Sequence, residues 1–241
     1  MLIKQKIVIL FRDNVGADQI KYYWVYYGNP SVTEPINPAL ETGELVYDFE
    51  IAEKEVTGSA SCSAGTYKEY RITLVNGRQV KVKVCSRVAD IVSINKGMKI
   101  TLKTNRGRVA WAYIYLTEAP SIMSGTKGTV EIRYSVDVES SGDQYLGKFY
   151  IANKAWKLSL EEGDHVKVIS YDVGRLGKND VYFYFRLREF SNIIATHIIY
   201  LNKTVIDYIR KESASIDTAY WSSSSGYRCP KRRRAWVAPA Y

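Results

Sequence analysis

The clearest hydrophobic pattern in the chain is a pair of alternating runs over residues 70–84, joined at Asn76-Gly77. Asn-Gly between two alternating runs is typical of a β-hairpin. A two-residue loop would place apolar Ile72 opposite Lys81, so apolar and charged side chains would share one face of the hairpin. A three-residue loop that ends at the same glycine places Ile72 opposite Val80, so we predict this register and a left-handed glycine.

Further short apolar runs predict strands along most of the chain, because they are rich in β-branched and aromatic residues. These runs cover residues 6–11, 20–27, 44–56, 98–104, 108–116, 181–187 and 193–201. The runs 98–104 and 108–116 indicate a second hairpin. Residues 108–116 are apolar on both faces, which predicts a strand that is covered on both sides by a second sheet, a helix or another subunit.

Three segments between these runs carry other signals. Small residues over 57–66 predict a flexible loop, and residues 119–128 predict a linker. A cap at Asn202 or Thr204 would begin a short helix that ends near Glu212.

These patterns predict an all-β, mainly antiparallel protein made of two tandem β-barrel or β-sandwich units, with a short helix near the C-terminus and an extended basic tail. The expected boundaries are an N-terminal β domain at 1–118, a second β domain at 128–212 and the tail at 213–241. The form A-x-x-x-S-[IL]-x-x-G occurs at Ala89 and at Ala155. It indicates that the second domain partly repeats residues 70–116, with a chance match as the alternative.

Composition adds a preference for certain partners. The chain has 241 residues, 20 tyrosines and a net charge of +9. Tyrosine suits sheet surfaces, protein interfaces and base stacking, and a basic protein favours polyanions. Few Cys, Met and His beside many Ile, Val, Tyr and Lys is a pattern associated with heat-adapted proteins, which suggests a hyperthermophilic source or its virus.

The tail, 213–241, concentrates the basic charge. Five cations against Asp217 give +4 in this segment, and aromatic residues are spaced among them. Such a composition should not fold alone, so a partner is expected. The residues that we expect to contact nucleic acid or a neighbouring protein here are Tyr227, Arg228, Lys231, Arg232, Arg233, Arg234 and Trp236.

A second candidate surface lies on the 70–84 hairpin and the strand at 181–187. Its members are Arg71, Arg78, Lys81, Lys83, Tyr182, Tyr184, Arg186 and Arg188. Cations among aromatic rings suit a platform for single-stranded nucleic acid, whereas an ordinary solvated sheet face is the plainer alternative. Arg71 opposite Lys81 is a like-charge pair, mildly unfavourable unless an acidic group lies beside it.

The sequence contains no recognisable enzyme motif. The segment 142–149, GDQYLGKF, is one position from a phosphate-binding loop but has Phe149 where a hydroxyl is needed. His165 and His197 have no acidic or cysteine partner at ligand spacing, so each is expected to be a sheet residue. The candidate carboxylates for a catalytic pair are Asp137, Glu139, Glu161, Glu162 and Asp164, and nothing in the sequence brings two of them together.

Three cysteines, Cys62, Cys85 and Cys229, lack C-x-x-C spacing. A disulfide framework and a zinc site are therefore not expected, and no metal or cofactor is predicted. No apolar run reaches the length of a membrane span, and the N-terminus does not match a signal peptide. A virion or the cytoplasm is the expected location.

Two functions fit these observations. The first is a non-enzymatic structural or assembly protein, such as a virion capsid, adaptor or tail subunit, that forms a homo-oligomer or binds other assembly subunits. Its basic tail would dock on neighbours or on DNA or RNA. The alternative is a tandem protein with OB-like folds that binds single-stranded nucleic acid.

Overall fold

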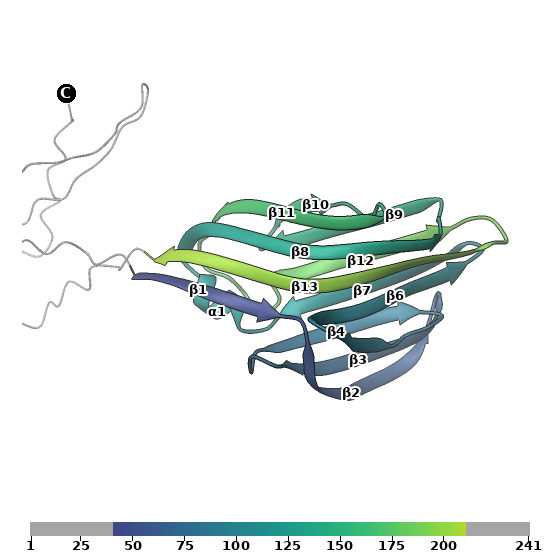
Figure 1. Cartoon of the computed structure of the whole chain (residues 1–241), viewed down its shortest axis with the longest axis horizontal. Helices are drawn as coiled ribbons and strands as arrows, with labels where there is room; N and C mark the ends of the chain where they lie inside the picture. Colours follow the sequence, from purple (N-terminus) through teal and green to yellow (C-terminus); the bar gives the residue numbers. More distant parts are fainter. Residues whose placement is uncertain (1–40, 211–241) are drawn as a thin grey trace, which may run out of the picture. The chain divides into compact units, whose positions relative to one another are not determined.

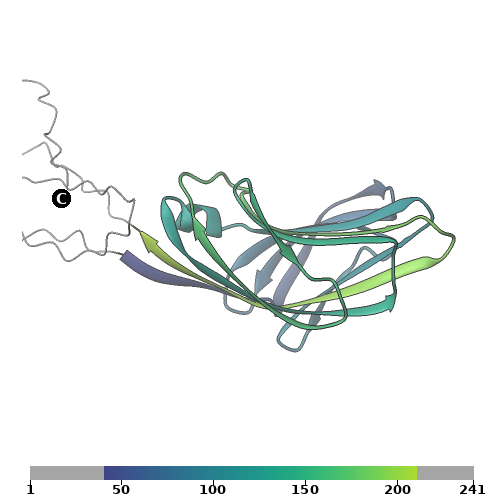
Figure 2. The same cartoon turned by 90° about the horizontal axis from the view of Figure 1, so that it is seen from above.

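The computed structural model describes residues 41–210. Strands dominate this region, and they form two antiparallel sheets stacked as layers (Figures 1 and 2). The expected all-β, mainly antiparallel character is confirmed. The predicted strands at 6–11 and 20–27 and the tail residues 213–241 lie outside the described residues.

The first sheet, sheet A, contains six strands. In spatial order they are β11 (Gly163–Asp172), β8 (Thr126–Ser140), β13 (Ile194–Arg210), β6 (Gly97–Asn105) and β5 (Ile91–Ile94), while β1 (Glu41–Asp48) pairs with the last part of β13. The long strand β13 is the centre of the sheet, because it pairs with β8 along its length and with β6 and β1 in turn on its other side.

The second sheet, sheet B, contains seven strands. In spatial order they are β10 (Lys154–Leu158), β9 (Gln144–Ile151), β12 (Val181–Glu189), β7 (Arg108–Leu116), β4 (Gln79–Ser86), β3 (Gly65–Leu74) and β2 (Ile51–Cys62). The core lies between the sheets and is filled by alternate side chains. Phe183 on β12 contacts Phe149 at 4.8 Å between ring centroids and Phe49 at 6.0 Å.

The hairpin of β3 and β4 has the predicted three-residue register. Ile72 lies opposite Val80, and Gly77 has a φ of 81°, in the left-handed region that glycine adopts at little cost. Arg71 does lie opposite Lys81, and each cation has an acidic partner on a neighbouring strand: Arg71 pairs with Glu55, and Lys81 pairs with Glu69. These carboxylates remove the like-charge repulsion.

The arrangement of two tandem units is replaced by one interleaved sandwich. Strands that precede residue 118 and strands that follow residue 128 occur in both sheets, and residues 41–210 all belong to one compact unit. The sheets are open and are not closed barrels. Periodicity along one strand cannot reveal this mixing, because it does not say which sheet the strand joins.

The repeated form A-x-x-x-S-[IL]-x-x-G precedes a strand of sheet A in both places, since Gly97 begins β6 and Gly163 begins β11. The strands before them differ. β5 pairs with β6 in sheet A, whereas β10 pairs with β9 in sheet B. The similarity in the described region is therefore limited to the entry into one strand.

Four local predictions are corrected. Residues 57–66 are not a loop, because β2 continues to Cys62 and β3 begins at Gly65. The predicted linker contains a short helix, α1 (Ala119–Met123), with Pro120 in its first turn.

The predicted hairpin of 98–104 and 108–116 is a crossing between layers, since β6 and β7 belong to different sheets. Leu45 and Ile51 belong to two strands in different sheets and not to one.

The predicted helix from Asn202 or Thr204 is wrong for the residues described. They continue β13 as far as Arg210, where pairing with β1 on one side and β8 on the other satisfies the backbone. The cap signal at Asn202 or Thr204 that favoured a helix is outweighed by these two ladders. Sheet context therefore overrides a weak local signal.

The expectation about the cysteines is also corrected, because Cys62 and Cys85 form a disulfide. It links the end of β2 to β4 across the first residues of β3. An odd number of cysteines without a regular spacing gave no indication of this pair, which only the strand register brings together. Separately, none of the described helices has the length and apolar character needed to cross a bilayer.

Candidate functional site

The outer surface of sheet B carries a contiguous group of aromatic side chains, which we call the aromatic face. Its members are Tyr67, Trp111, Tyr113, Tyr115, Tyr150, Tyr182 and Tyr184. All seven are half-buried. They come from four strands, β3, β7, β9 and β12, and lie on one face because directly opposed residues in antiparallel strands share a face.

The rings of the aromatic face pack against each other. Tyr150 stacks on Tyr182 with centroids 4.6 Å apart and planes at 9°, and Tyr113 stacks on Tyr184 at 4.6 Å and 28°. Tyr115 lies 5.3 Å from Tyr182 and continues the group towards β4. Much of each ring surface therefore contacts a neighbouring ring, and the phenol edges face outward.

Charged side chains border the rings on both sides. On one side Lys81 lies opposite Tyr115 and Lys83 lies opposite Tyr113. On the other side Lys148 lies opposite Tyr184. The cations of this border are Lys81, Lys83, Lys148 and Arg186, and the one carboxylate among them is Glu69. These five side chains carry four positive charges and one negative charge, a net charge of +3.

Glu69 organises the charges on the β3–β4 side. Its carboxylate pairs with Lys81, lies 3.7 Å from Lys83 and accepts a hydrogen bond of 2.8 Å from the Tyr67 hydroxyl. The hydrogen bonds from Lys81 and Tyr67 hold the pKa of Glu69 below its usual range. This carboxylate is therefore ionised at neutral pH and fixes both the lysines and the neighbouring ring.

The hydroxyls of Tyr67 and Tyr113 remain protonated across the physiological range. Burial, aided by the neighbouring phenols, raises the pKa of Tyr113 to about 12. Burial and the hydrogen bond to Glu69 raise the pKa of Tyr67 to about 12. The aromatic face therefore offers neutral hydroxyl groups, which donate and accept hydrogen bonds, beside lysine and arginine cations.

The structure brings together six of the residues predicted for a contact surface. They are Arg71, Lys81, Lys83, Tyr182, Tyr184 and Arg186, and all lie on the outer side of sheet B. Arg78 does not belong with them, because it donates to the Val46 carbonyl and pairs with Glu118 at the hairpin end. Arg188 lies over the Phe190 ring at 4.3 Å, away from the tyrosines. The predicted tail contacts lie outside the described residues.

Sequence reasoning missed most of the rings that form this face. Trp111, Tyr113 and Tyr115 line the outer surface of sheet B, so no second sheet or helix among residues 41–210 covers them, and their cover by another subunit stays a prediction. The alternation with small residues, in VAWAYIYL, was the available signal: Ala110 and Ala112 face the core, and the large rings face outward.

A second region, rich in carboxylates, lies at the end of the sandwich opposite Glu41 and Arg210. The β8–β9 connection and the β10–β11 connection both lie there, and residues 134–147 and 158–166 contain six carboxylates and no Lys or Arg. We call this region the acidic end; its carboxylates are Asp137, Glu139, Asp143, Glu161, Glu162 and Asp164. His197 of β13, predicted as a sheet residue and confirmed as one, lies beside Glu161 and Glu162 in a pocket there.

The predicted absence of an enzyme site stays a prediction. No group of three or more His, Cys, Asp or Glu side chains suited to a metal ion occurs within residues 41–210. The near-match to a phosphate loop at 142–149 runs into strand β9, so it lacks the helix whose amides would receive a phosphate.

No protein-family model matches this chain, and no curated protein matches it. Solved structures show distant likeness. The chain is similar to the secreted serine protease VesC from Vibrio cholerae at 10% identity and a TM-score of 0.30, covering 66% of this chain and 42% of that one. It thus spans less than half of that protease.

Two other solved structures are similar at the same level. One is described as "CBM4 structure and function", with 12% identity, a TM-score of 0.24 and coverage of 68% of this chain and 86% of that one. The other is the tailspike protein 4 of bacteriophage CBA120, with 7% identity, a TM-score of 0.22 and coverage of 68% and 19%. At these scores none of them supports an inference about function.

Proposed function

We propose that this protein is a non-enzymatic structural protein that assembles with copies of itself, with the aromatic face of one copy against the acidic end of the next. A virion component is the specific form of this proposal. Its support is a tyrosine-rich sheet surface, a net positive charge on that surface and a cluster of carboxylates elsewhere on the same unit.

The observation that carries the proposal is the packing of the rings. Tyrosines that stack on each other form a rigid surface whose phenol edges are already ordered, so little side-chain entropy is lost on binding. Tyrosine and arginine are enriched in protein interfaces for this reason among others. The ring pairs Tyr150–Tyr182 and Tyr113–Tyr184 have this arrangement.

The same geometry weakens the alternative of a single-strand binding platform. Base stacking needs ring faces that are open to the ligand. Here the faces of Tyr113 and Tyr182 are covered by other tyrosines. The net charge of +3 is the observation that still favours a nucleic acid, because phosphates can pair with lysines without stacking.

Charge complementarity supports a second copy as the occupant. The aromatic face is net positive, and the acidic end contains six carboxylates without a Lys or Arg in the same segments. Contact between two different surfaces of identical subunits is heterologous, and such contacts build rings or open filaments. An extended assembly is therefore the expected product, as a structural protein requires.

Light scattering after size exclusion tests the proposal over a range of protein and salt concentrations. The wild-type mass should rise with concentration at low salt and fall as salt screens the charges. The double variant Lys83→Glu and Lys148→Glu should shift association to at least tenfold higher concentration. Lys99→Glu, on the outer face of sheet A beside Tyr200, is the matched control and should leave it unchanged.

A strictly monomeric protein at low salt and high concentration would contradict the proposal. Binding of a labelled oligonucleotide separates the alternative: with four cations engaged, the log-log salt slope for a single strand is roughly −3. If the Lys83→Glu and Lys148→Glu variant loses oligonucleotide binding while the wild type never self-associates, the nucleic-acid function replaces the assembly function.

A further inference from the structure

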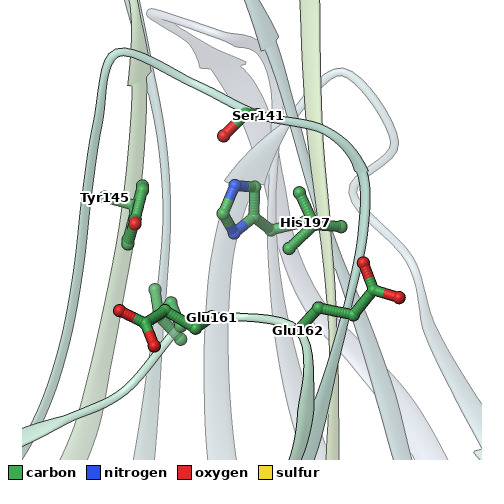
Figure 3. A pocket seen from close by; sticks show the side chains of 7 residues that line it. Ser141, Tyr145, Glu161, Glu162 and His197 are labelled. Carbon is green, nitrogen blue, oxygen red and sulfur yellow. The ribbon is translucent and has the colours of Figure 1, made fainter.

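The acidic end contains a pocket of about 250 Å³, which is small by the standard of ligand sites in proteins. Its lining residues are Val138, Ser141, Tyr145, Leu160, Glu161, Glu162 and His197. Figure 3 shows the imidazole of His197 between Ser141 on one side and the two glutamates on the other, with Tyr145 beside it. The pocket has room for a single functional group and a short chain.

The His197 side chain at the base of this pocket makes no hydrogen bond of ordinary geometry, although the Leu160 backbone lies near its ring. The residue is 1% exposed, and neither ring nitrogen makes a hydrogen bond of normal geometry with another described residue. The Tyr145 ring lies 5.1 Å from the imidazole at an angle of 39°. Buried polar atoms are usually paired, so an unpaired buried imidazole that faces a pocket indicates a ligand.

Burial lowers the pKa of His197, and the Leu160 backbone offsets this effect in part. The imidazole is therefore neutral at pH 7, and a neutral ring has one nitrogen that accepts a hydrogen bond. A positively charged group can then approach without meeting a charged histidine.

Two carboxylates also line the pocket. Glu161 and Glu162 line the opening from the β10–β11 connection, and neither carboxylate forms an ion pair with a residue in the range 41–210. The pocket thus combines an imidazole acceptor, two carboxylates and an aromatic ring. A cation with several N–H donors in one plane matches this combination.

We infer that this pocket binds a guanidinium group. Guanidinium is planar, carries five N–H donors in a fork that suits a carboxylate, and stacks on aromatic rings such as that of Tyr145. A primary ammonium group has the charge but neither the fork nor the flat surface. A divalent metal ion is a poorer match, because the described residues offer no three ligands together.

The guanidinium group can come from two sources. One is an arginine side chain of a neighbouring copy, for which the sequence offers Arg232, Arg233 and Arg234. The other is a free small molecule. The inference about the pocket stands without the proposed function, because neither source requires the aromatic face.

The chain's two histidines make the test direct, since each gives one set of imidazole signals in NMR. We would titrate the full chain with propylguanidinium and with propylurea, its neutral isostere, and assign the signals with the His165→Gln variant. Propylguanidinium should shift the His197 signals in a saturable way and by more than those of His165, whose ring nitrogen is hydrogen-bonded to the Glu161 carbonyl. Propylurea should leave both in place.

Variants with one carboxylate neutralised provide the comparison. Glu161→Gln and Glu162→Gln should each raise the dissociation constant for propylguanidinium about tenfold, whereas Glu139→Gln, an exposed carboxylate near Tyr200 on the outer side of β8, should change it less than twofold. Equal shifts with propylurea, no saturable shift, or equal effects of all three variants would overturn the inference.

A second arm identifies the source. A synthetic peptide of residues 224–236 should compete with propylguanidinium for the His197 signal if the neighbouring copy supplies the group, and the same peptide with its arginines replaced by citrulline should not. If propylguanidinium binds and the arginine peptide does not compete, the pocket is assigned to a free guanidinium compound. Either result supports guanidinium binding, and failure of light scattering to detect assembly would leave it standing.

Discussion

The ring of Tyr113 on β7 stacks on the ring of Tyr184 on β12, with centroids 4.6 Å apart. The two residues are directly opposed in the ladder that joins these strands. This pair lies at the centre of the aromatic face and joins the rings of β9 and β12 to those of β7 and β3. It is a structural contact and, in our account, part of an interface.

Substitution of Tyr184 separates these two roles. Tyr184→Ala removes the stacked ring and should lower the free energy of unfolding by about 1–2 kcal/mol. Tyr184→Phe keeps the ring and should change it by less than about 0.5 kcal/mol, while weakening self-association through the lost hydroxyl. Urea unfolding and light scattering measure the two effects. If Tyr184→Phe is as unstable as Tyr184→Ala, ring packing is not the source of stability here.

The disulfide makes a prediction about stability. Cys62 and Cys85 are separated by 23 residues in sequence, and a loop of that length corresponds to about 3 kcal/mol in the chain-entropy model. Replacement of both cysteines by alanine should therefore lower the free energy of unfolding by roughly this amount. Cys229→Ala is the control. A double variant as stable as the control, or a peptide map with free thiols at both positions, would contradict the assigned pair.

The buried imidazole predicts a pH dependence. Because the pKa of His197 is lowered in the folded state, the unfolded state binds a proton first as the pH falls. Stability should therefore decrease as the pH drops below about 6.5, the usual value for histidine, until the lower pKa of the folded state is reached. Urea unfolding at pH 7.5 and 5.5 should show this loss.

His197→Gln should reduce this difference. NMR titration gives an independent readout that needs no variant to fold, because the midpoint of the His197 signals should lie below 6.5. A midpoint above that value would show that the imidazole is charged and would remove the acceptor from the pocket.

Gly128 on β8 makes a prediction about packing. A side chain at this position would meet the backbone of Asp207 on β13, which cannot move without disturbing the central ladder. Gly128→Ala should therefore cost roughly 3 kcal/mol, as overpacking of a closed site does. Thr129→Ala, the next residue along the strand, is the matched control and should cost less than about 1 kcal/mol. Equal midpoints in thermal unfolding would contradict the close approach of the two strands.

The sequence predicts single strands and one register well, and it predicts their grouping poorly. The β3–β4 hairpin followed from Asn76-Gly77 and from the pairing of Ile72 with Val80, because the turn and the apolar alternation favour the same register. The signal for a turn of this kind lies in adjacent residues, so it can be read from the sequence. The placement of β6 and β7 in different sheets depends on residues far away in the sequence, and no feature of the connection at Gly107 indicates it.

The candidate sites show the same contrast between what local sequence predicts and what only the tertiary structure reveals. Tyr182, Tyr184, Lys81 and Lys83 were predicted on an outer face because alternation within one strand gives the face directly. The pocket required β8, β9, β13 and the β10–β11 connection to converge. The sequence placed His197 and Glu161 36 positions apart, with no spacing that suggested a shared site. Only the tertiary arrangement brings them together.

Cross-linking between isotopically distinct copies tests the central claim most directly. Equal amounts of ¹⁴N and ¹⁵N protein would be treated with a zero-length carbodiimide, which joins a lysine to a carboxylate in contact, and mixed-label peptides would be identified by mass spectrometry. Our account predicts mixed-label links from Lys83 or Lys148 to carboxylates of the acidic end, such as Glu161. Links within one copy alone, such as Lys81 to Glu69, would contradict it.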